Sequence, residues 1–309
     1  MFQNRLIKKA RLGSPVVECS PAIWNGRLYL AECWQRRWDD PPLPDESDYI
    51  QIRDVERNEI VATCMQGYGL ASAFVWDDVF YIFAARHRDG GHHDVNMTRS
   101  ADLIRWSDPQ VMLEEEPDED LFNQSVCHDG RRFIMAYESN DEAYPPFTIK
   151  FAESADLRNW VKIPGPVFGP DRYVACPAIR WAGGYYYMLY LERVAPAAEG
   201  RRAPSAAAHP ERGFETYLTH SRDLVTWEQA PHNPVITFDP MAECHPLYYE
   251  RRDPARTARE CNASDPDLVE WQGKTRVYFT GGCQKYAGDL QYAEFDGPMQ
   301  EFFESYYQR

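Results

Sequence analysis

The hydrophobic and polar positions of this chain repeat in five segments that share one order of residues. In each segment a small or polar start precedes an apolar run, a Gly or Asp turn and a run rich in aromatic residues. The segments are residues 19–31, 71–84, 123–137, 177–190 and 266–279. Two strand-like runs joined by a pair such as Asn25-Gly26 or Gln272-Gly273 are typical of a β-hairpin. The pattern therefore predicts five hairpins.

The hairpins recur along the chain at a nearly regular spacing. Successive turn residues are 52, 52, 54 and 89 positions apart, at Gly26, Asp78, Gly130, Gly184 and Gly273. A period of about fifty residues is the signature of a repeat architecture. The longer last interval predicts insertions near residues 194–214 and 228–262, which are rich in Pro, Ala, Arg and His.

A second motif, Ser-x-Asp-Leu-x-x-Trp, follows the hairpin of the second, third and fourth units. It occupies residues 100–106, 154–160 and 221–227. A β-sandwich has similar turns but gives no reason for one such motif in each unit. Four strands in each of five units instead predict an all-β fold, a five-bladed β-propeller, in which radial repetition leaves only short sheet edges.

The two ends of the chain are expected to meet in this fold. We expect residues 1–309 to form a single propeller domain, although a chain of this length often has two domains. The last unit lacks an outer strand after residues 291–295, and residues 2–10 are expected to supply it. A short helix is predicted over residues 298–307.

Charge and cysteine usage narrow the range of partners. The formal net charge is −15, so nucleic acids and anionic membranes are disfavoured as partners. None of the eight cysteines belongs to a Cys-x-x-Cys pair, and no signal-like segment or run of eighteen apolar residues is present. We therefore expect reduced thiols and a cytoplasmic location, and the sequence leaves the oligomeric state open.

The repeated phrases resemble those of the five-bladed propeller glycoside hydrolases, the group of families 43, 32, 117 and 130. Blades of that group carry similar Ser-x-Asp-Leu-x-x-Trp and Asp-Gly-x-Tyr-Tyr-x-x-Tyr phrases, and the resemblance covers roughly residues 15–300. It implies a propeller that cleaves glycosidic bonds. The catalytic positions of family 43 arabinanases and xylosidases correspond here to Ser20, Phe122 and Ala175, so the chain departs from that catalytic set.

Carboxylates are expected to gather at one mouth of the propeller. The first strand of each hairpin begins, and the second ends, on the same face of the ring because the two strands are antiparallel. The candidate catalytic residues on this face are Glu18, Glu32, Glu138, Asp265 and Asp267. Cleavage of a glycosidic bond needs one acid and one base or nucleophile. We expect Asp265 or Asp267 to act as the base and Glu138 or Glu32 as the acid, with inversion if their separation leaves room for water.

The same face offers candidates for substrate binding. They are Trp34, which is expected to stack on a sugar ring, and Arg86, His87, Asn123, Glu192 and Arg193, joined by Glu243 and His245 from the long insertion. Ser20, Cys33, Ser72, Gln124, Cys176 and Gln284 complete the face without an expected role. For each carboxylate the alternative is a structural one, a pairing with Arg86, Arg99 or Arg193.

No metal site or cofactor is predicted, although a structural calcium or sodium ion in the central channel stays open. The run His92-His93-Asp94 is not expected to bind zinc, because adjacent loop histidines point apart. The leading hypothesis is a glycoside hydrolase that acts from the end of an oligosaccharide. The alternatives are a non-catalytic carbohydrate-binding propeller and, behind it, a phosphorylase of the family 130 type, which would need basic residues for phosphate.

Overall fold

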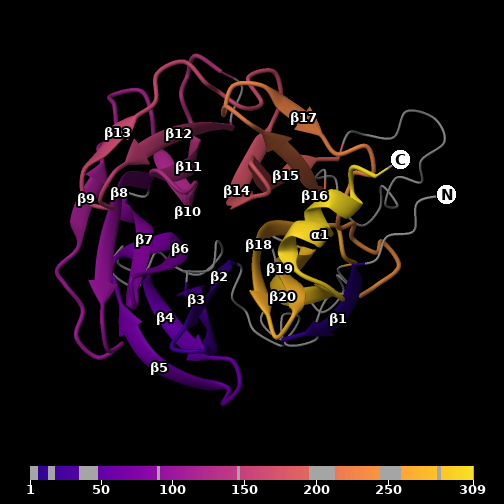
Figure 1. Cartoon of the computed structure of the whole chain (residues 1–309), viewed down its shortest axis with the longest axis horizontal. Coiled ribbons are helices and arrows are strands. Elements are labelled where there is room, and N and C mark those ends of the chain that lie inside the picture. Colours follow the sequence, from indigo (N-terminus) through magenta and orange to yellow (C-terminus); the bar gives the residue numbers. More distant parts are fainter. Residues whose placement is uncertain are drawn as a thin grey trace.

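The computed structural model shows five four-stranded antiparallel sheets arranged around one centre, which is a five-bladed β-propeller (Figure 1). It describes residues 6–12, 18–34, 48–88, 91–144, 147–194, 213–243, 259–283 and 287–308. The first strand of each blade lies nearest the centre of the ring (Figure 1). The all-β propeller predicted from the repeat is confirmed.

The blades follow the order of the chain. Blade one contains β2 (Cys19–Trp24), β3 (Arg27–Trp34), β4 (Tyr49–Asp54) and β5 (Glu59–Cys64). Blade two contains β6 (Tyr68–Trp76), β7 (Val79–Arg88), β8 (Gly91–Ser100) and β9 (Gln110–Leu113). Blade three contains β10 (Leu121–His128), β11 (Phe133–Ser139), β12 (Thr148–Ser154) and β13 (Trp160–Lys162). Blade four contains β14 (Val174–Ala182), β15 (Tyr185–Arg193), β16 (Phe214–Ser221) and β17 (Trp227–Gln229).

The fifth blade joins the two ends of the chain. It contains β18 (Ser264–Trp271), β19 (Lys274–Cys283) and β20 (Ala287–Phe295), and β1 (Ile7–Arg11) pairs antiparallel with β20 as its outer strand. The predicted closure by the N-terminal segment is therefore confirmed, with the strand placed at 7–11. The predicted C-terminal helix is α1 (Met299–Ser305), which buries Phe302 and Phe303. In the described part of the chain, no helix is long and apolar enough to span a membrane.

The predicted turn chemistry appears in the backbone. In the loops Asn25-Gly26, Asp77-Asp78, Gly183-Gly184 and Gln272-Gly273, both residues have positive φ angles, between 47° and 84°. Two left-handed residues make the turn that matches the twist of a two-stranded hairpin, and Gly and Asn adopt it at low cost. Blade three instead has a four-residue loop between His128 and Phe133.

The Ser-x-Asp-Leu-x-x-Trp motif forms the turn between the third and fourth strands of blades two, three and four. In blade two the Ser100 hydroxyl accepts the Leu103 N–H at 2.8 Å, and Asp102 Oδ1 accepts the N–H groups of Ile104 and Arg105 at 2.9 and 2.8 Å. Leu103 is buried at a φ of 57°. The side-chain acceptors offset the unusual backbone, which explains why the motif needs Ser and Asp at these spacings.

The hydrophobic core is divided among the spaces between neighbouring blades. Five clusters of buried side chains each join two adjacent sheets, and the cluster between blades four and five also takes in the helix. Phe80, Phe151 and Phe279 are almost completely buried in these layers. The aromatic-rich second strands thus fix the blades against one another and hold the inner strands rigidly around the centre.

Candidate functional site

Five equivalent residues, one from each blade, line the mouth of the central channel. In every blade the inner strand pairs with the second strand in an equivalent register. The equivalent paired residues of the five inner strands are Ser20, Ser72, Ser125, Ala178 and Asp267. The residues two positions before them are Glu18, Leu70, Asn123, Cys176 and Asp265. Each of the last four has a left-handed φ, between 46° and 52°, at a register shift of its strand. Such β-bulges redirect a side chain, here toward the pocket.

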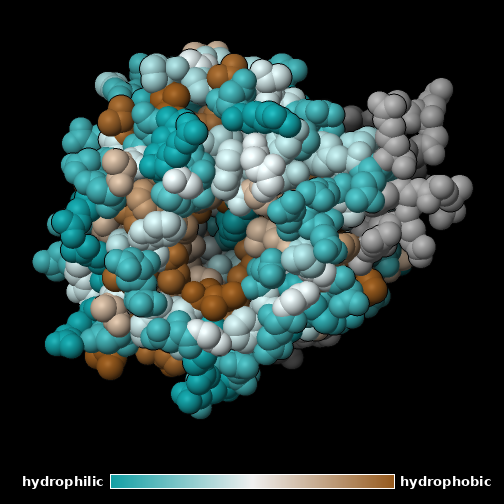
Figure 2. All heavy atoms as spheres, viewed as in Figure 1, coloured by the Kyte–Doolittle hydropathy of each residue, from teal (hydrophilic) through white to brown (hydrophobic). Residues whose placement is uncertain are grey.

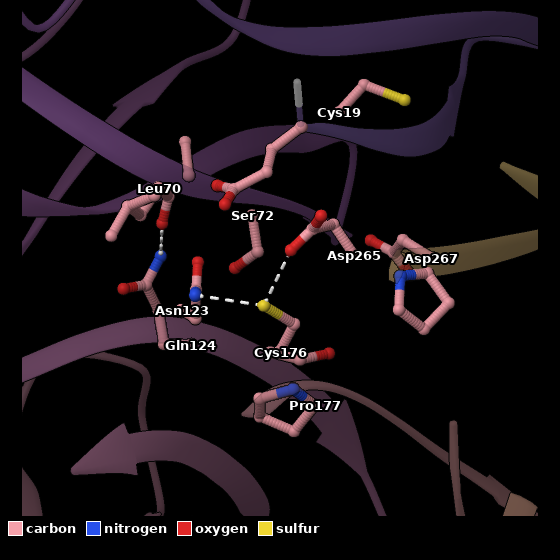
Figure 3. A pocket seen from close by; sticks show the side chains of 13 residues that line it. Cys19, Leu70, Ser72, Asn123, Gln124, Cys176, Pro177, Asp265 and Asp267 are labelled. Atoms are coloured by element: carbon pink, nitrogen blue, oxygen red, sulfur yellow. Dashed lines mark hydrogen bonds between the residues drawn. The ribbon is translucent and has the colours of Figure 1, made fainter. Parts of the chain in front are cut away.

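These residues enclose a pocket of about 340 Å³, counted out to its opening. The surface of the molecule is hollowed near its centre (Figure 2). The pocket is lined by Glu18, Cys19, Leu70, Ala71, Ser72, Asn123, Gln124, Ser125, Cys176, Pro177, Asp265, Pro266 and Asp267 (Figure 3). Three of these residues are acids, and none of the lining residues is Lys, Arg or His.

Glu18 and Asp265 are the acids that face the pocket most directly. One carboxylate oxygen of each acid and the Cys176 sulfur lie within 4.8 Å of one another. Burial raises the pKa of Glu18 well above its usual value, and the negative charges of Asp265 and Glu138 add to this shift. Burial also raises the pKa of Asp265, although hydrogen bonds from Cys176 and Ser264 oppose it. Burial and their mutual repulsion thus disfavour the state in which both carboxyl groups are charged.

Glu138 lies behind the pocket wall and is only 2% exposed. One of its oxygens accepts Asn123 Nδ2–H at 2.7 Å and the Cys176 backbone N–H at 3.0 Å. Burial raises the pKa of Glu138 to about 7, although the hydrogen bonds from Asn123 and Cys176 favour its charged form. Glu138 is thus placed to position Asn123 and Cys176 and does not line the pocket.

Cys176 connects Asp265, which faces the pocket, with Glu138 behind the pocket wall. Its Sγ–H donates to Asp265 Oδ1 at 2.8 Å, and its sulfur accepts Asn123 Nδ2–H at 3.1 Å (Figure 3). Burial, followed by the charges of Asp265 and Glu138, raises the pKa of the thiol. The thiol therefore acts as a hydrogen-bond donor beside Asp265 and not as a thiolate nucleophile.

Asp267, two residues after Asp265, has a different environment. It lines the pocket but accepts Arg180 Nη2–H at 2.5 Å, Ser20 Oγ–H at 2.5 Å and the Leu268 N–H at 2.7 Å. Ser20 and Arg180 come from blades one and four, so Asp267 links three blades. This environment favours a structural role for Asp267.

Two other candidate acids lie outside the pocket lining. Glu32 is buried in blade one, where Arg53 donates two hydrogen bonds to it, at 2.7 and 3.1 Å, and Gln51 donates another. Glu192 accepts hydrogen bonds from Arg172 at 2.9 Å and from the Tyr190 hydroxyl at 2.7 Å. The sequence left open that these acids have a structural role in a pair with an arginine. Both acids do pair with an arginine, but with Arg53 and Arg172 instead of Arg86, Arg99 or Arg193.

The remaining candidates are spread around the rim. Trp34 is 41% exposed and stacks on Tyr49, and Arg86 is exposed. His87 contacts Asp48 through Nδ1, and Arg193 lies 4.8 Å from the centre of the Tyr173 ring. Glu243 is exposed beside Arg259, whereas His245 and Gln284 lie outside the described residues.

Of the predicted site residues, the structure brings Glu18, Asn123, Asp265 and Asp267 to the pocket, with Glu138 directly behind them.

Two pocket features were not assigned a role from the sequence. Leu70 was not expected at the mouth, although its position 52 residues after Glu18 would have indicated it. Ser72 was expected there without a role, and its buried hydroxyl makes no hydrogen bond with any described residue. A buried hydroxyl without a protein partner is explained by a bound water, an ion, a ligand or local strain.

Among the residues that the structure describes, two groups of side chains have the geometry to hold a metal ion. Glu18, Cys176 and Asp265 form one, and His93, Glu115 and Asp120 form the other, each with ligand atoms within 4.8 Å of one another. Calcium and sodium prefer oxygen ligands, so the thiol makes the first group poorly suited to the ions considered for the channel. A thiol among carboxylates fits zinc better.

Comparison with solved structures finds the same fold in several glycoside hydrolases. The catalytic domain of the Coprinopsis cinerea GH62 α-L-arabinofuranosidase matches with a TM-score of 0.63 at 11% identity, over 94% of this chain and 96% of that one. The native Bacillus subtilis arabinanase Arb43A matches at 0.58 and 7% identity, over 93% and 96%. A complex of BT0996 with RGII matches at 0.62 and 12% identity, over 97% and 90%.

No family model and no curated protein matches the sequence. The identities with the solved structures are low, so these matches establish the fold. The chain is a five-bladed β-propeller whose structural neighbours are glycoside hydrolases of the GH43, GH62 and GH32 types. The sequence resemblance had predicted such neighbours and had named families 43 and 32 among them.

Proposed function

We propose that this protein is a glycoside hydrolase that cleaves the terminal sugar of an oligosaccharide with Glu18 and Asp265. The observation that carries the proposal is the pair itself: two carboxyl groups with raised pKa values, from different blades, with oxygens within 4.8 Å in one pocket. Carboxylates paired in this way are the chemical requirement for hydrolysis of a glycosidic bond.

Glu18 is assigned as the general acid. Its pKa is raised the most clearly by burial and by the neighbouring negative charges, so it keeps a proton that it can donate. The proton passes to the glycosidic oxygen as the bond between this oxygen and the anomeric carbon breaks. This assignment differs from the expectation of Glu138 or Glu32, because neither of those residues lines the pocket.

Asp265 is assigned as the nucleophile. Its carboxylate is oriented by the Cys176 thiol and by Ser264, and it attacks the anomeric carbon as the leaving group departs. Water then attacks the same carbon, Glu18 takes up a proton from it, and the sugar is released with Asp265 regenerated. Retaining glycosidases hold their carboxyl groups about 5–5.5 Å apart, against about 6.5–9.5 Å for inverting ones. The close pair therefore favours retention.

Glu138 is assigned as a positioning residue. It holds the Asn123 amide and the Cys176 backbone in place, and its pKa of about 7 makes the charge behind the pocket depend on pH. A change at Glu138 is therefore expected to alter the pH dependence of the reaction more than substrate affinity.

The central position of the pocket supports action on a terminal sugar. Its lining residues come from the inner ends of all five blades, so a sugar bound there would contact residues of every blade. A carbohydrate partner also agrees with the neighbouring structures, one of which is a complex with RGII.

A non-catalytic binding propeller fits this pocket less well. Buried acids with raised pKa values are typical of catalytic sites, which favours the hydrolase. A phosphorylase would need cationic side chains for phosphate, and the lining residues include none.

The proposal is tested by sugar release from a panel of nitrophenyl glycosides and of arabinan, xylan and RGII oligosaccharides. Glu18→Gln and Asp265→Asn should each lower kcat/KM at least roughly 100-fold while the circular dichroism spectrum is unchanged. Asp156→Asn, which changes a carboxylate in a distant turn, should keep full activity. Equal activity in all four proteins would refute the assignment.

A further inference from the structure

The pocket is lined at two levels along the inner strands of the blades. Glu18 and Asp265 belong to the level nearest the mouth, and Ser72, Ser125 and Asp267 belong to the level two positions further along the strands. Because the inner strands begin at the mouth, the second level lies deeper in the channel than the two acids. A molecule that reaches both acids from the mouth therefore has the second level beneath it.

Ser72 differs from the serines that occupy the equivalent position in the neighbouring blades. Ser20 accepts the Ala73 N–H of the next blade at 2.9 Å, and Ser125 accepts the Ile179 N–H at 3.1 Å. Ser72 lines the pocket and is 5% exposed, and its hydroxyl bonds to no described residue. The two neighbouring serines thus connect blades, whereas the hydroxyl of Ser72 is left for another partner.

The orientation of Ser72 indicates where this partner lies. Its hydroxyl points toward the space between Asn123 and Cys176 (Figure 3). A serine hydroxyl donates one hydrogen bond and accepts others, and a sugar hydroxyl does the same, so the two groups match without any charge. This match makes no demand on the protonation of Glu18 or on the hydrogen bonds that Asp265 already accepts.

We infer that Ser72 determines specificity: it binds a hydroxyl group of the terminal sugar on the side of the ring remote from the scissile bond. The inference rests on the proposed function, because that function places the anomeric carbon at Glu18 and Asp265 and lets the leaving group depart through the mouth. The deeper level then faces the opposite side of the ring. A substituent on this hydroxyl would have to enter the buried space around Ser72, so the substrate class is a glycoside whose terminal sugar carries this hydroxyl free.

The first experiment couples the side chain to one hydroxyl of the substrate. The kcat/KM of wild type and of Ser72→Ala is measured with the best nitrophenyl glycoside of the panel and with derivatives that each lack one ring hydroxyl. We expect Ser72→Ala to lower kcat/KM for the parent glycoside roughly 10- to 30-fold, and to have no effect on the derivative without the hydroxyl farthest from the anomeric carbon. An equal loss with the parent and all derivatives, or coupling to the hydroxyl next to the anomeric carbon, would overturn the inference.

Thermal unfolding of the free protein separates binding from a structural role. Ser72→Ala should leave Tm unchanged, whereas Ser125→Ala should lower it, because only Ser125 accepts a backbone N–H. Ser305→Ala is the control for activity: its buried hydroxyl bonds to the Phe302 carbonyl in α1, so it should keep the wild-type ranking of parent and derivatives. An equal fall of Tm in Ser72→Ala and Ser125→Ala would show that the hydroxyl supports the fold, and would overturn the inference.

Binding without catalysis distinguishes this inference from the proposed hydrolysis. Calorimetry compares wild type and Ser72→Ala with D-glucose, D-galactose, D-xylose and L-arabinose. A sugar that binds wild type more tightly than Ser72→Ala, with no cleavage of any glycoside, would support the contact with Ser72 and refute the hydrolase. Cleavage at the same kcat/KM in wild type and Ser72→Ala would overturn the inference and leave the hydrolase intact.

Discussion

The propeller uses carboxylates in two regions, and they have opposite properties. In the outer turns of blades two, three and four, hydrogen bonds from backbone N–H groups lower the pKa values of Asp102, Asp156 and Asp223. At the pocket and directly behind it, burial raises the pKa values of Glu18, Asp265 and Glu138. The turn residues are stabilised as anions, whereas the pocket residues are destabilised as anions.

This difference separates residues that hold the fold from residues kept for chemistry. A carboxylate that accepts backbone N–H groups contributes to stability whenever it is charged. A carboxylate buried beside other acids costs stability, and such a cost is typical of functional sites. The repeat supplies both kinds, since the outer turns and the inner strand ends recur around the ring.

The largest effect is expected from moving the acid without removing it. Glu18→Asp withdraws the carboxyl group by one methylene, so kcat should fall roughly 100-fold with a small change in KM. Steady-state kinetics on the best substrate of the panel measures this effect. Glu119→Asp is the matched control, because Glu119 is buried but paired with Lys150, outside the pocket lining. A similar fall of kcat in the control would remove the distinction between the two regions.

A large effect on stability is expected from Asp267, the pocket aspartate that is paired with Arg180. Arg180→Met leaves Asp267 in a largely buried position without its cation, so the free energy of unfolding should decrease by about 3 kcal/mol. Urea unfolding measures the change. The double variant Arg180→Met with Asp267→Asn should regain most of the loss, and no regain would mean that the ion pair is not the cause.

The pH dependence of stability should reflect the pocket. Because the pKa of Glu138 is raised from its ordinary value to about 7, the folded state keeps a proton that the unfolded state loses. The free energy of unfolding should therefore fall as pH rises, by about 2 kcal/mol between roughly pH 5 and 7, and level off above. Glu138→Gln should show a shallower slope over this range. An unchanged slope would mean that a group other than Glu138 causes the pH dependence in this range.

The smallest effect is expected in the outer turns. Asp156→Ala removes the acceptor for the N–H groups of Arg158 and Asn159, at 2.9 and 2.8 Å, so Tm should fall by about 2 °C with activity unchanged. Differential scanning calorimetry at neutral pH measures this shift. The difference between Asp156→Ala and wild type should shrink in acid, where the carboxylate is protonated, and a constant difference would contradict this account.

The repeat in the sequence was enough to predict the fold, because each blade has its own local pattern. The Asn25-Gly26 type of turn and the Ser-x-Asp-Leu-x-x-Trp motif are local features, and both have the expected backbone geometry. The closure of blade five by the N-terminal strand was also predicted, because the last unit lacked an outer strand and the N-terminal segment belonged to no other unit.

The site was predicted only in part, because burial and pairing depend on neighbouring blades. Asp265 and Asp267 are indistinguishable by strand position, but only Asp267 meets Arg180. Glu138 was expected in the pocket, but the bulge at Asn123 places an amide in front of it. Glu18 was one of five candidate acids, and only the register of the ring identifies it as the equivalent of Asp265.

Whether Asp265 is the nucleophile is tested most directly by mass spectrometry of the protein after incubation with a fluorinated glycosyl donor of its best substrate, which slows hydrolysis of a covalent intermediate. We expect a glycosyl adduct on the peptide that contains Asp265, absent from Asp265→Asn and slower to form in Glu18→Gln. Turnover of the natural substrate with no adduct, or an adduct on another residue, would contradict it.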